Sequence, residues 1–225
     1  MNLERLGTSR IWFAKFQTQY EMTATMLRPQ ECCECPNKKF RNHIFNMEEY
    51  ADWYANTYGN FTYYSDWHGF NLPVKYVFKL YNEFPDLSNK ERKLIESVFE
   101  CGAKQEDYLI TCFVEDGTFS ATMSHEIAHG LFCTDKKYRK EVKKILKTIS
   151  DTKIDKLKQV MKEQGYCPSV YLDEIHAYLM GDYRICPIFN KFLNKKQLNS
   201  LVPIQEELKK QLKNCADEYN IDVCV

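Results

Sequence analysis

One short stretch, residues 124–130, constrains this chain more than any other, and it reads Ser-His-Glu-Ile-Ala-His-Gly. On an α-helix His125 and His129 lie one turn apart on the same face, so both imidazoles can bind one metal ion with Glu126 held beside it. With 5 histidines in 225 residues, a chance match to this pattern is on the order of one in a hundred. The stretch predicts a metal-binding helix; the alternative is an amphipathic helix with two ordinary histidines.

The residue types indicate both the metal and its chemistry. Two neutral imidazoles and a carboxylate hold Zn²⁺ while leaving one position for water, whose pKa the metal lowers towards neutrality. A carboxylate at the position of Glu126 can accept the proton of that water and pass it to a leaving amine. We therefore expect His125 and His129 to be zinc ligands and Glu126 to be the general base.

The flanking sequence is favourable for such a site. Residues 108–114 form an apolar run rich in β-formers, and residues 115–117 end it with a turn. A helix follows, with Thr118 or Ser120 as its cap. Its apolar side consists of Met123, Ile127, Ala128 and Leu131.

This order of strand and motif helix resembles the zincin metallopeptidases. The resemblance implies that residues 108–114 are the edge strand of a sheet, and that a peptide substrate lies along it and pairs by strand addition. It also implies a zincin-like α+β fold.

A catalytic zinc site needs a third protein ligand, and the sequence offers two candidates. Asp135 lies six residues after His129, where some zincins place their third ligand, but Phe132 stands where those proteins have a turn-forming glycine. The other candidate is Glu174. Residues 174–177, Glu-Ile-His-Ala, resemble the glutamate-x-x-alanine helix of the gluzincins, and this resemblance implies that Glu174 is the third ligand.

The Glu174 helix is expected over residues 171–180, with Ser169 as its cap and Gly181 after its end. Tyr178 lies one turn after Glu174 and is the first candidate for a hydrogen-bond donor to the oxyanion; Tyr183 and Arg184 follow the Gly181 turn. Asp173 can orient a zinc-bound histidine, although a surface acid fits equally well. His176 is expected to point nearly opposite Glu174.

The length of 225 residues suits a single zincin-like domain, with an N-terminal lobe over about residues 1–116 and a helical C-terminal lobe over about residues 117–225. We expect a small, mainly antiparallel sheet in the N-terminal half. Strands are predicted at 11–16 and 61–64, helices at 47–58 and 88–100, and a loop at 65–73 that includes His68. The C-terminal helices are predicted at 135–150, 154–164, 195–201 and 204–219.

Charge and cysteine content limit the partners and the compartment. Lys+Arg and Asp+Glu both number 31, so nothing marks a nucleic-acid or anionic-membrane binder, and the lysines of residues 136–147 are read as a solvated helix face.

No signal peptide or membrane span is recognised, which favours reduced cysteines and a cytoplasmic location; export by a non-classical route stays open. Cys32, Cys33 and Cys35, with His43 nearby, are expected to be free thiols rather than a structural zinc site.

Two functional classes follow. The first is a zinc-dependent peptidase that hydrolyses a peptide or protein substrate. The second is a zincin-fold sensor or interaction module that binds metal but has little turnover. The two classes differ in the role of Glu126. In the peptidase it takes part in bond cleavage, whereas in the module it contributes only to the shape of the site. A third reading, in which the motif is fortuitous, predicts no bound metal.

Overall fold

The computed structural model describes residues 1–115, 117, 119–180 and 187–223. Helices hold 61% of the residues, and the few strands form one four-stranded sheet, so the predicted α+β class is confirmed. The first half contains β1 (Leu3–Arg5), β2 (Ile11–Phe16), α1 (Gln19–Glu34), α2 (Met47–Tyr58), α3 (Tyr63–Asp66), β3 (Gly69–Pro73), α4 (Lys75–Glu83), α5 (Asn89–Glu100) and β4 (Tyr108–Phe113). The second half contains α6 (Phe119–Thr134), α7 (Lys136–Leu146), α8 (Asp151–Glu163), the 3-10 turn η1 (Pro168–Val170), α9 (Tyr171–Met180), α10 (Pro187–Asn190), α11 (Lys195–Asn199) and α12 (Val202–Glu218).

The sheet is mixed, with strand order β1-β2-β4-β3. β1 and β3 each pair antiparallel with an inner neighbour, whereas β2 and β4 run parallel from Ile11↔Tyr108 to Phe16↔Phe113. The prediction that residues 108–114 form the edge strand is therefore wrong, because β4 has a partner on each side. All six residues of β4 are buried, as expected for an interior strand. The edge strands are β1 and β3, and β3, which lies next to β4, falls within the stretch predicted as a loop.

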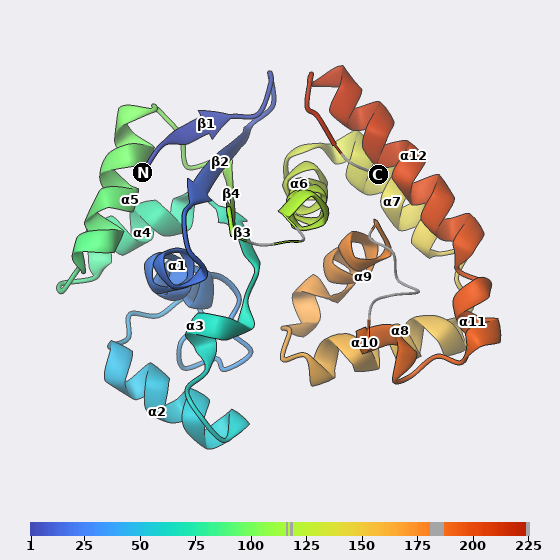
Figure 1. Cartoon of the computed structure of the whole chain (residues 1–225), viewed down its shortest axis with the longest axis horizontal. Coiled ribbons are helices and arrows are strands. Elements are labelled where there is room, and N and C mark those ends of the chain that lie inside the picture. Colours follow the sequence, from blue (N-terminus) through green and yellow to red (C-terminus); the bar gives the residue numbers. More distant parts are fainter. Residues whose placement is uncertain (116, 118, 181–186, 224–225) are drawn as a thin grey trace.

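Alternate residues of the inner strands point into two buried clusters. Phe13, Ile110 and Cys112 belong to a cluster shared with α6, α7, α9 and α12, whereas Ala14, Leu109 and Phe113 belong to one shared with α1, α4 and α5. Figure 1 shows the sheet and α1–α5 on one side and α7–α12 on the other, with α6 between them. The sheet therefore presents one face to each half of the chain.

The motif helix packs unusually close to the sheet. A Cβ atom at Gly130 would lie 2.7 Å from Cδ1 of Ile11 on β2. Gly130 has no side chain and leaves room for this approach. Helix α6 therefore packs against the sheet just after His129, the second histidine of the motif.

Most of the predicted helices and the two apolar strands form as expected. β2 and α2 have the predicted bounds, Ser88 caps α5 in a capping box, and Asp135 caps α7. α7 ends at Leu146, four residues before the predicted end, and Ser169 lies in η1. Residues 61–64 were predicted to be a strand, but residues 63 and 64 form the first half of the short helix α3 instead. Asp116, Thr118, Gly181, Tyr183 and Arg184 lie outside the described residues.

The longest element that the sequence did not predict is α1. Thr18 caps it, and Arg28 anchors it through a buried ion pair with Glu91, in which Nη2 lies 2.6 Å from Oε2. Because both partners are almost fully buried, this pair fixes α1 against α5. The last turn of α1 carries Glu31 and Glu34 towards the functional cleft.

None of the helices in the described parts of the chain combines the length and the apolar character needed to cross a bilayer. The two-lobe division of a single zincin-like domain stays a prediction.

Candidate metal centre

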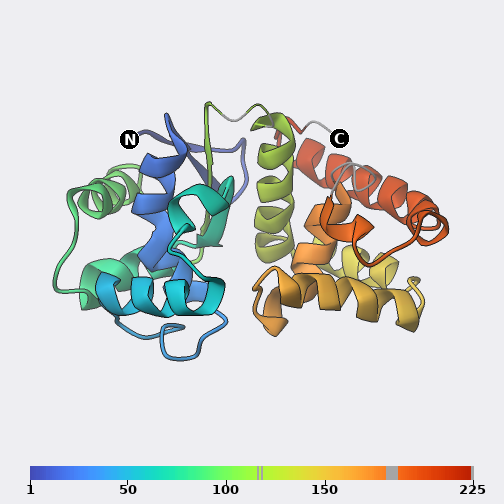
Figure 2. The ribbon, with the colours of Figure 1, turned by 60° about the horizontal axis from the view of Figure 1, so that its bottom comes forward.

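The structure brings the three predicted ligands together. His125 and His129 lie on α6, and Glu174 lies on the adjacent helix α9; both helices are visible in Figure 2, where α6 stands between the halves. His125 Nε2 and His129 Nε2 are 3.1 Å apart, and Glu174 Oε2 lies 3.9 Å and 3.6 Å from them. Across the described residues, this is the one group of three or more His, Cys, Asp or Glu side chains whose ligand atoms converge in this way.

The geometry fits a tetrahedral metal ion. Ligand atoms about 2.05 Å from zinc at tetrahedral angles are roughly 3.3 Å from one another, close to the separations found here. Glu174 Oε2 is buried and accepts no hydrogen bond. A buried carboxylate oxygen without a partner is costly, and a cation at this point would remove that cost. That the cation is zinc stays a prediction.

The electrostatics of the two histidines also favour a cation. Burial, together with the neighbouring His129, lowers the pKa of His125 well below its ordinary value, so its imidazole is the neutral form that binds metals. Burial opposes charge on His129 as well, but Asp173 and Glu174 outweigh it and raise the pKa of His129 well above the ordinary value. These two carboxylates attract positive charge to the point where the ligand atoms meet.

Asp173 occupies the supporting position that the sequence analysis considered for it. Its Oδ1 atom lies 2.9 Å from Nδ1 of His129 and 3.3 Å from Nδ1 of His176. His176 is fully buried, and its Nε2 atom lies 3.1 Å from the hydroxyl of Tyr138 on α7. A carboxylate on the outer nitrogen of a metal-binding histidine favours one ring orientation. His176 also contacts the backbone of the same residue, because its Nδ1 atom lies 2.8 Å from the carbonyl oxygen of Asp173.

Glu126 is buried beside the ligands and is held by the edge strand. Asn71 on β3 donates a 2.9 Å hydrogen bond from Nδ2 to Glu126 Oε2, and the Tyr108 hydroxyl donates to Asn71 Oδ1 at 2.7 Å. A Cβ atom at Gly69 would lie 2.3 Å from Glu126 Oε1. Burial raises the pKa of Glu126 to about 7, although His129 and the Asn71 hydrogen bond oppose the rise. A carboxylate with such a pKa suits proton transfer near neutrality.

A cleft of about 820 Å³ opens over this site. Its walls include His125, Glu126 and Glu174 on one side and β3 residues Gly69–Asn71 on the other. Tyr178 also lines it, with its ring centroid 4.9 Å from that of His125, and its hydroxyl lies 2.9 Å from the hydroxyl of Tyr166.

Several residues of this cleft were not predicted from the sequence. Asn71, Gly69 and Tyr166 were not predicted to belong to the site, and His68 was read as more consistent with a surface loop, yet all four line the cleft. The alternation of apolar Phe70 and Leu72 with Gly69 and Asn71 was the available sequence signal for a strand, and in the structure it matches the burial pattern of β3.

Two other metal interpretations receive no support. Asp135, the alternative third ligand, caps α7 and accepts hydrogen bonds from the Tyr138 backbone N–H at 2.8 Å and the Tyr219 hydroxyl at 2.9 Å. It is absent from the convergent group. Cys32, Cys33 and Cys35 are free thiols near the end of α1 and are not part of any such group among the described residues.

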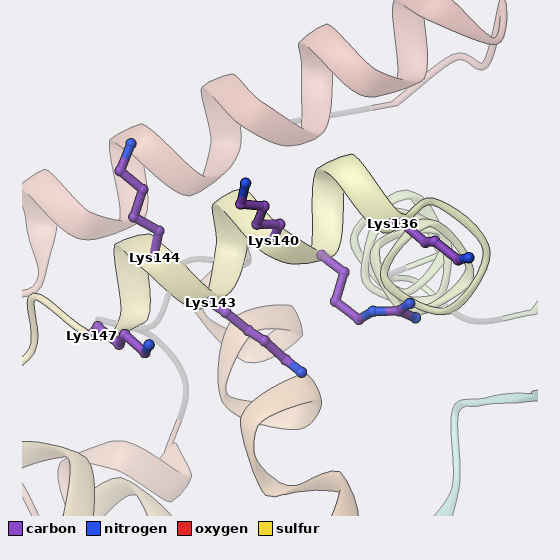
Figure 3. A pocket seen from close by; sticks show the side chains of 6 residues that line it. Lys136, Lys140, Lys143, Lys144 and Lys147 are labelled. Atoms are coloured by element: carbon purple, nitrogen blue, oxygen red, sulfur yellow. The ribbon is translucent and has the colours of Figure 1, made fainter.

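The basic face of α7 lies apart from the cleft. Figure 3 shows its lysine side chains spreading outward along the helix, and Lys136, Lys140, Lys143, Lys144 and Lys147 are all exposed. The other face of α7 buries Tyr138, Val142 and Leu146 in the core. This arrangement is the solvated face that helical spacing predicted. The absence of a nucleic-acid partner stays a prediction.

Comparisons of this chain with protein-family models, with curated proteins and with solved structures find no significant match. The resemblance to zincins and gluzincins therefore rests on the motif residues and on the site geometry.

Proposed function

We propose that this protein is a zinc-dependent peptidase, with His125, His129 and Glu174 as zinc ligands and Glu126 as the general base. One observation carries the proposal. Three ligand atoms from two helices converge within 4.8 Å of one another at the wall of a cleft that an edge strand also borders. Metal ligands, a buried carboxylate and a strand edge are the parts that hydrolysis of an extended peptide requires.

Zinc bound at this site would lower the pKa of a water molecule and polarise the carbonyl group of the scissile bond. Glu126 accepts a proton from the attacking water and delivers it to the leaving amine, so one proton moves from the nucleophile to the leaving group as the C–N bond breaks. Asn71 holds the carboxylate in place for this transfer by its hydrogen bond to Oε2.

The cleft also offers groups for the substrate. β3 is the last strand of the sheet, and no other described strand pairs with its outer edge, so a peptide can add to it by backbone hydrogen bonds. The hydroxyl pair of Tyr166 and Tyr178 supplies a donor for the oxyanion, and Tyr178 is the candidate nearer the metal ligands through its contact with His125.

A reducing, cytoplasm-like compartment belongs to the same proposal. Seven cysteines of the described residues are free thiols, namely Cys32, Cys33, Cys35, Cys101, Cys133, Cys167 and Cys215, and the first three lie close together near the end of α1. Free thiols in such number are typical of proteins that work where thiols stay reduced.

The test compares wild type with Glu126→Gln, both loaded with zinc, on a degenerate peptide library read by mass spectrometry. The amide keeps the shape of the carboxylate but not its basicity, so cleavage should fall by at least about 10²–10⁴-fold while zinc content is unchanged. Equal cleavage by the two proteins would remove Glu126 from the mechanism. A library left intact by wild type would favour the metal-binding module without turnover.

A further inference from the structure

The cleft extends beyond the metal centre into a pocket walled by α1, α2 and α3. We call this extension the aromatic pocket. Its walls carry the rings of Tyr50, Trp53, Tyr54, Tyr58, Tyr63 and Trp67. The rings pack edge to face or tilted, with centroids 5.8 Å apart for Tyr50 and Tyr63 and 4.6 Å apart for Tyr54 and Tyr58. Tyr50, Tyr54 and Tyr63 are buried in this packing and make the walls rigid, whereas the more exposed Trp53, Tyr58 and Trp67 present ring surface to the cleft.

The charges that line the cleft have one sign. Outside the metal centre, its acidic residues are Glu31, Glu34, Asp66 and Glu163. Of the described residues that line the cleft, none is lysine or arginine. Glu31 is buried on the floor, where burial raises its pKa, and it accepts a 2.9 Å hydrogen bond from the Tyr63 hydroxyl. No lysine or arginine among the described lining residues offsets its charge when it is ionised.

The same part of the cleft contains a buried hydrogen-bond acceptor that has no partner. Gln30 is 7% exposed, lines the cleft, and donates its side-chain N–H to Glu34. Its Oε1 atom is buried and has no hydrogen-bond partner. A buried acceptor that stays unsatisfied is destabilising, so a ligand that brings a hydrogen-bond donor to this point would be favoured.

We propose that the aromatic pocket binds the cationic side chain of a lysine or arginine residue in the peptide substrate, close to the scissile bond. This inference rests on the proposed peptidase function. Aromatic faces attract a cation. Burial raises the pKa of both Glu31 and Glu34, and a bound cation would favour their ionised forms, which accept charge-assisted hydrogen bonds. An apolar side chain would leave the acceptors unsatisfied, and an acidic side chain would be repelled.

The position of the pocket places this side chain next to the reaction. Glu31 and Glu34 line the same cleft as the ligands His125 and Glu174, and the charges of Glu174 and His129 act on the pKa of Glu34. The floor of the aromatic pocket therefore adjoins the metal centre, and a residue bound there is near the bond to be cleaved. Glu31 and Glu34 are the specificity-determining residues in this account.

Direct binding tests the pocket without any turnover. N-acetyl-arginine amide, N-acetyl-lysine amide, N-acetyl-norleucine amide and N-acetyl-glutamate amide are titrated by NMR into the metal-free and the zinc-loaded protein. Both basic amides should bind at least tenfold more tightly than the norleucine and glutamate amides, in both forms of the protein. The double variant Glu31→Gln/Glu34→Gln should lose this preference, whereas Glu96→Gln, which removes an exposed acid on α5, should keep it.

Cleavage of the degenerate peptide library is the second test of the aromatic pocket. Wild type should cleave preferentially beside lysine or arginine, and Glu31→Gln/Glu34→Gln should cleave with that preference reduced at least tenfold. Binding of the basic amides with no cleavage of any peptide would overturn the peptidase function and leave the cation pocket standing. Cleavage with no basic preference, together with equal binding of the basic and norleucine amides, would overturn the cation pocket and leave the peptidase function standing.

Discussion

The two walls of the cleft differ in how they are built. The wall made by α6 and α9 carries His125, His129, Glu126 and Glu174 on two helices that pack against each other, with Asp173, His176 and Tyr138 supporting them from behind. The opposite wall collects its residues from α1, α2, α3 and β3, over short elements and the connections between them. In the proposed function, the first wall performs the chemistry and the second recognises the substrate.

This difference follows from what each task demands. Metal ligands must be placed to within a fraction of an ångström, which buried helices and their supporting hydrogen bonds achieve. Recognition requires a shaped surface, which many elements can assemble together. The two walls meet where β3 contacts Glu126, through Asn71 and the space left by Gly69.

The largest expected effect lies on the catalytic wall. Tyr178→Phe removes the proposed oxyanion donor and should lower kcat by about 10²–10³-fold with little change in KM, because the lost hydrogen bond strengthens only in the transition state. Tyr166→Phe is the matched control, since it removes the hydroxyl that Tyr178 contacts but not the proposed donor. Steady-state kinetics on a library-derived peptide measures both. An unchanged kcat in Tyr178→Phe would exclude it as the donor.

The junction between the walls is tested by Gly69→Ala. The added methyl group would lie 2.3 Å from Glu126 Oε1 and must displace that carboxylate. A displacement of about 1 Å should lower kcat/KM by roughly 10²-fold while zinc content stays at the wild-type level. Gly117→Ala is the control, because a Cβ atom there meets nothing within 4 Å. Full activity in Gly69→Ala would show that β3 does not position the base.

The difference between the two walls also explains which residues of the site could be predicted from the sequence. His125, His129 and Glu126 were found because helical spacing alone places them together, and Glu174 because its own helix has a recognisable local pattern. Gly69, Asn71, Gln30 and Tyr166 have no such local signature, and they become neighbours only when β3 pairs with β4 and α1 packs beneath it. The strand 108–114 was wrongly placed at the edge because strand order depends on long-range pairing, which the hydrophobic pattern does not encode.

Behind the metal centre, Asp173→Asn tests the support of His129. Burial opposes ionisation of Asp173, but His129 and His176 lower its pKa to about 2, so it is a carboxylate at neutral pH. Replacing it with an amide should weaken zinc binding by about 10–100-fold, measured by competition with a chelator. Asp151→Asn, on the exposed start of α8, should leave zinc affinity unchanged. Equal affinity in wild type and Asp173→Asn would mean that Asp173 does not support the ligand.

The burial of Glu126 has a consequence for the metal-free protein. Because its pKa rises from an ordinary value near 4.5 to about 7 on folding, the folded state binds the proton more tightly. The free energy of unfolding should therefore fall as pH rises from about 4.5 to 7 and level off above that range. Denaturant unfolding should show a decrease about 3 kcal/mol larger in wild type than in Glu126→Gln. Parallel pH profiles for the two proteins would contradict the burial of this carboxyl group.

The central claim is that one zinc ion joins the two helices through His125, His129 and Glu174. Its most direct test is the zinc content and affinity of the purified protein and of His125→Ala, His129→Ala and Glu174→Ala, with His68→Ala as a matched cleft histidine outside the ligand set. The account predicts one zinc per chain in wild type and in His68→Ala, and greatly weakened binding in the other three variants. Zinc bound by Glu174→Ala with wild-type stoichiometry and affinity would contradict it.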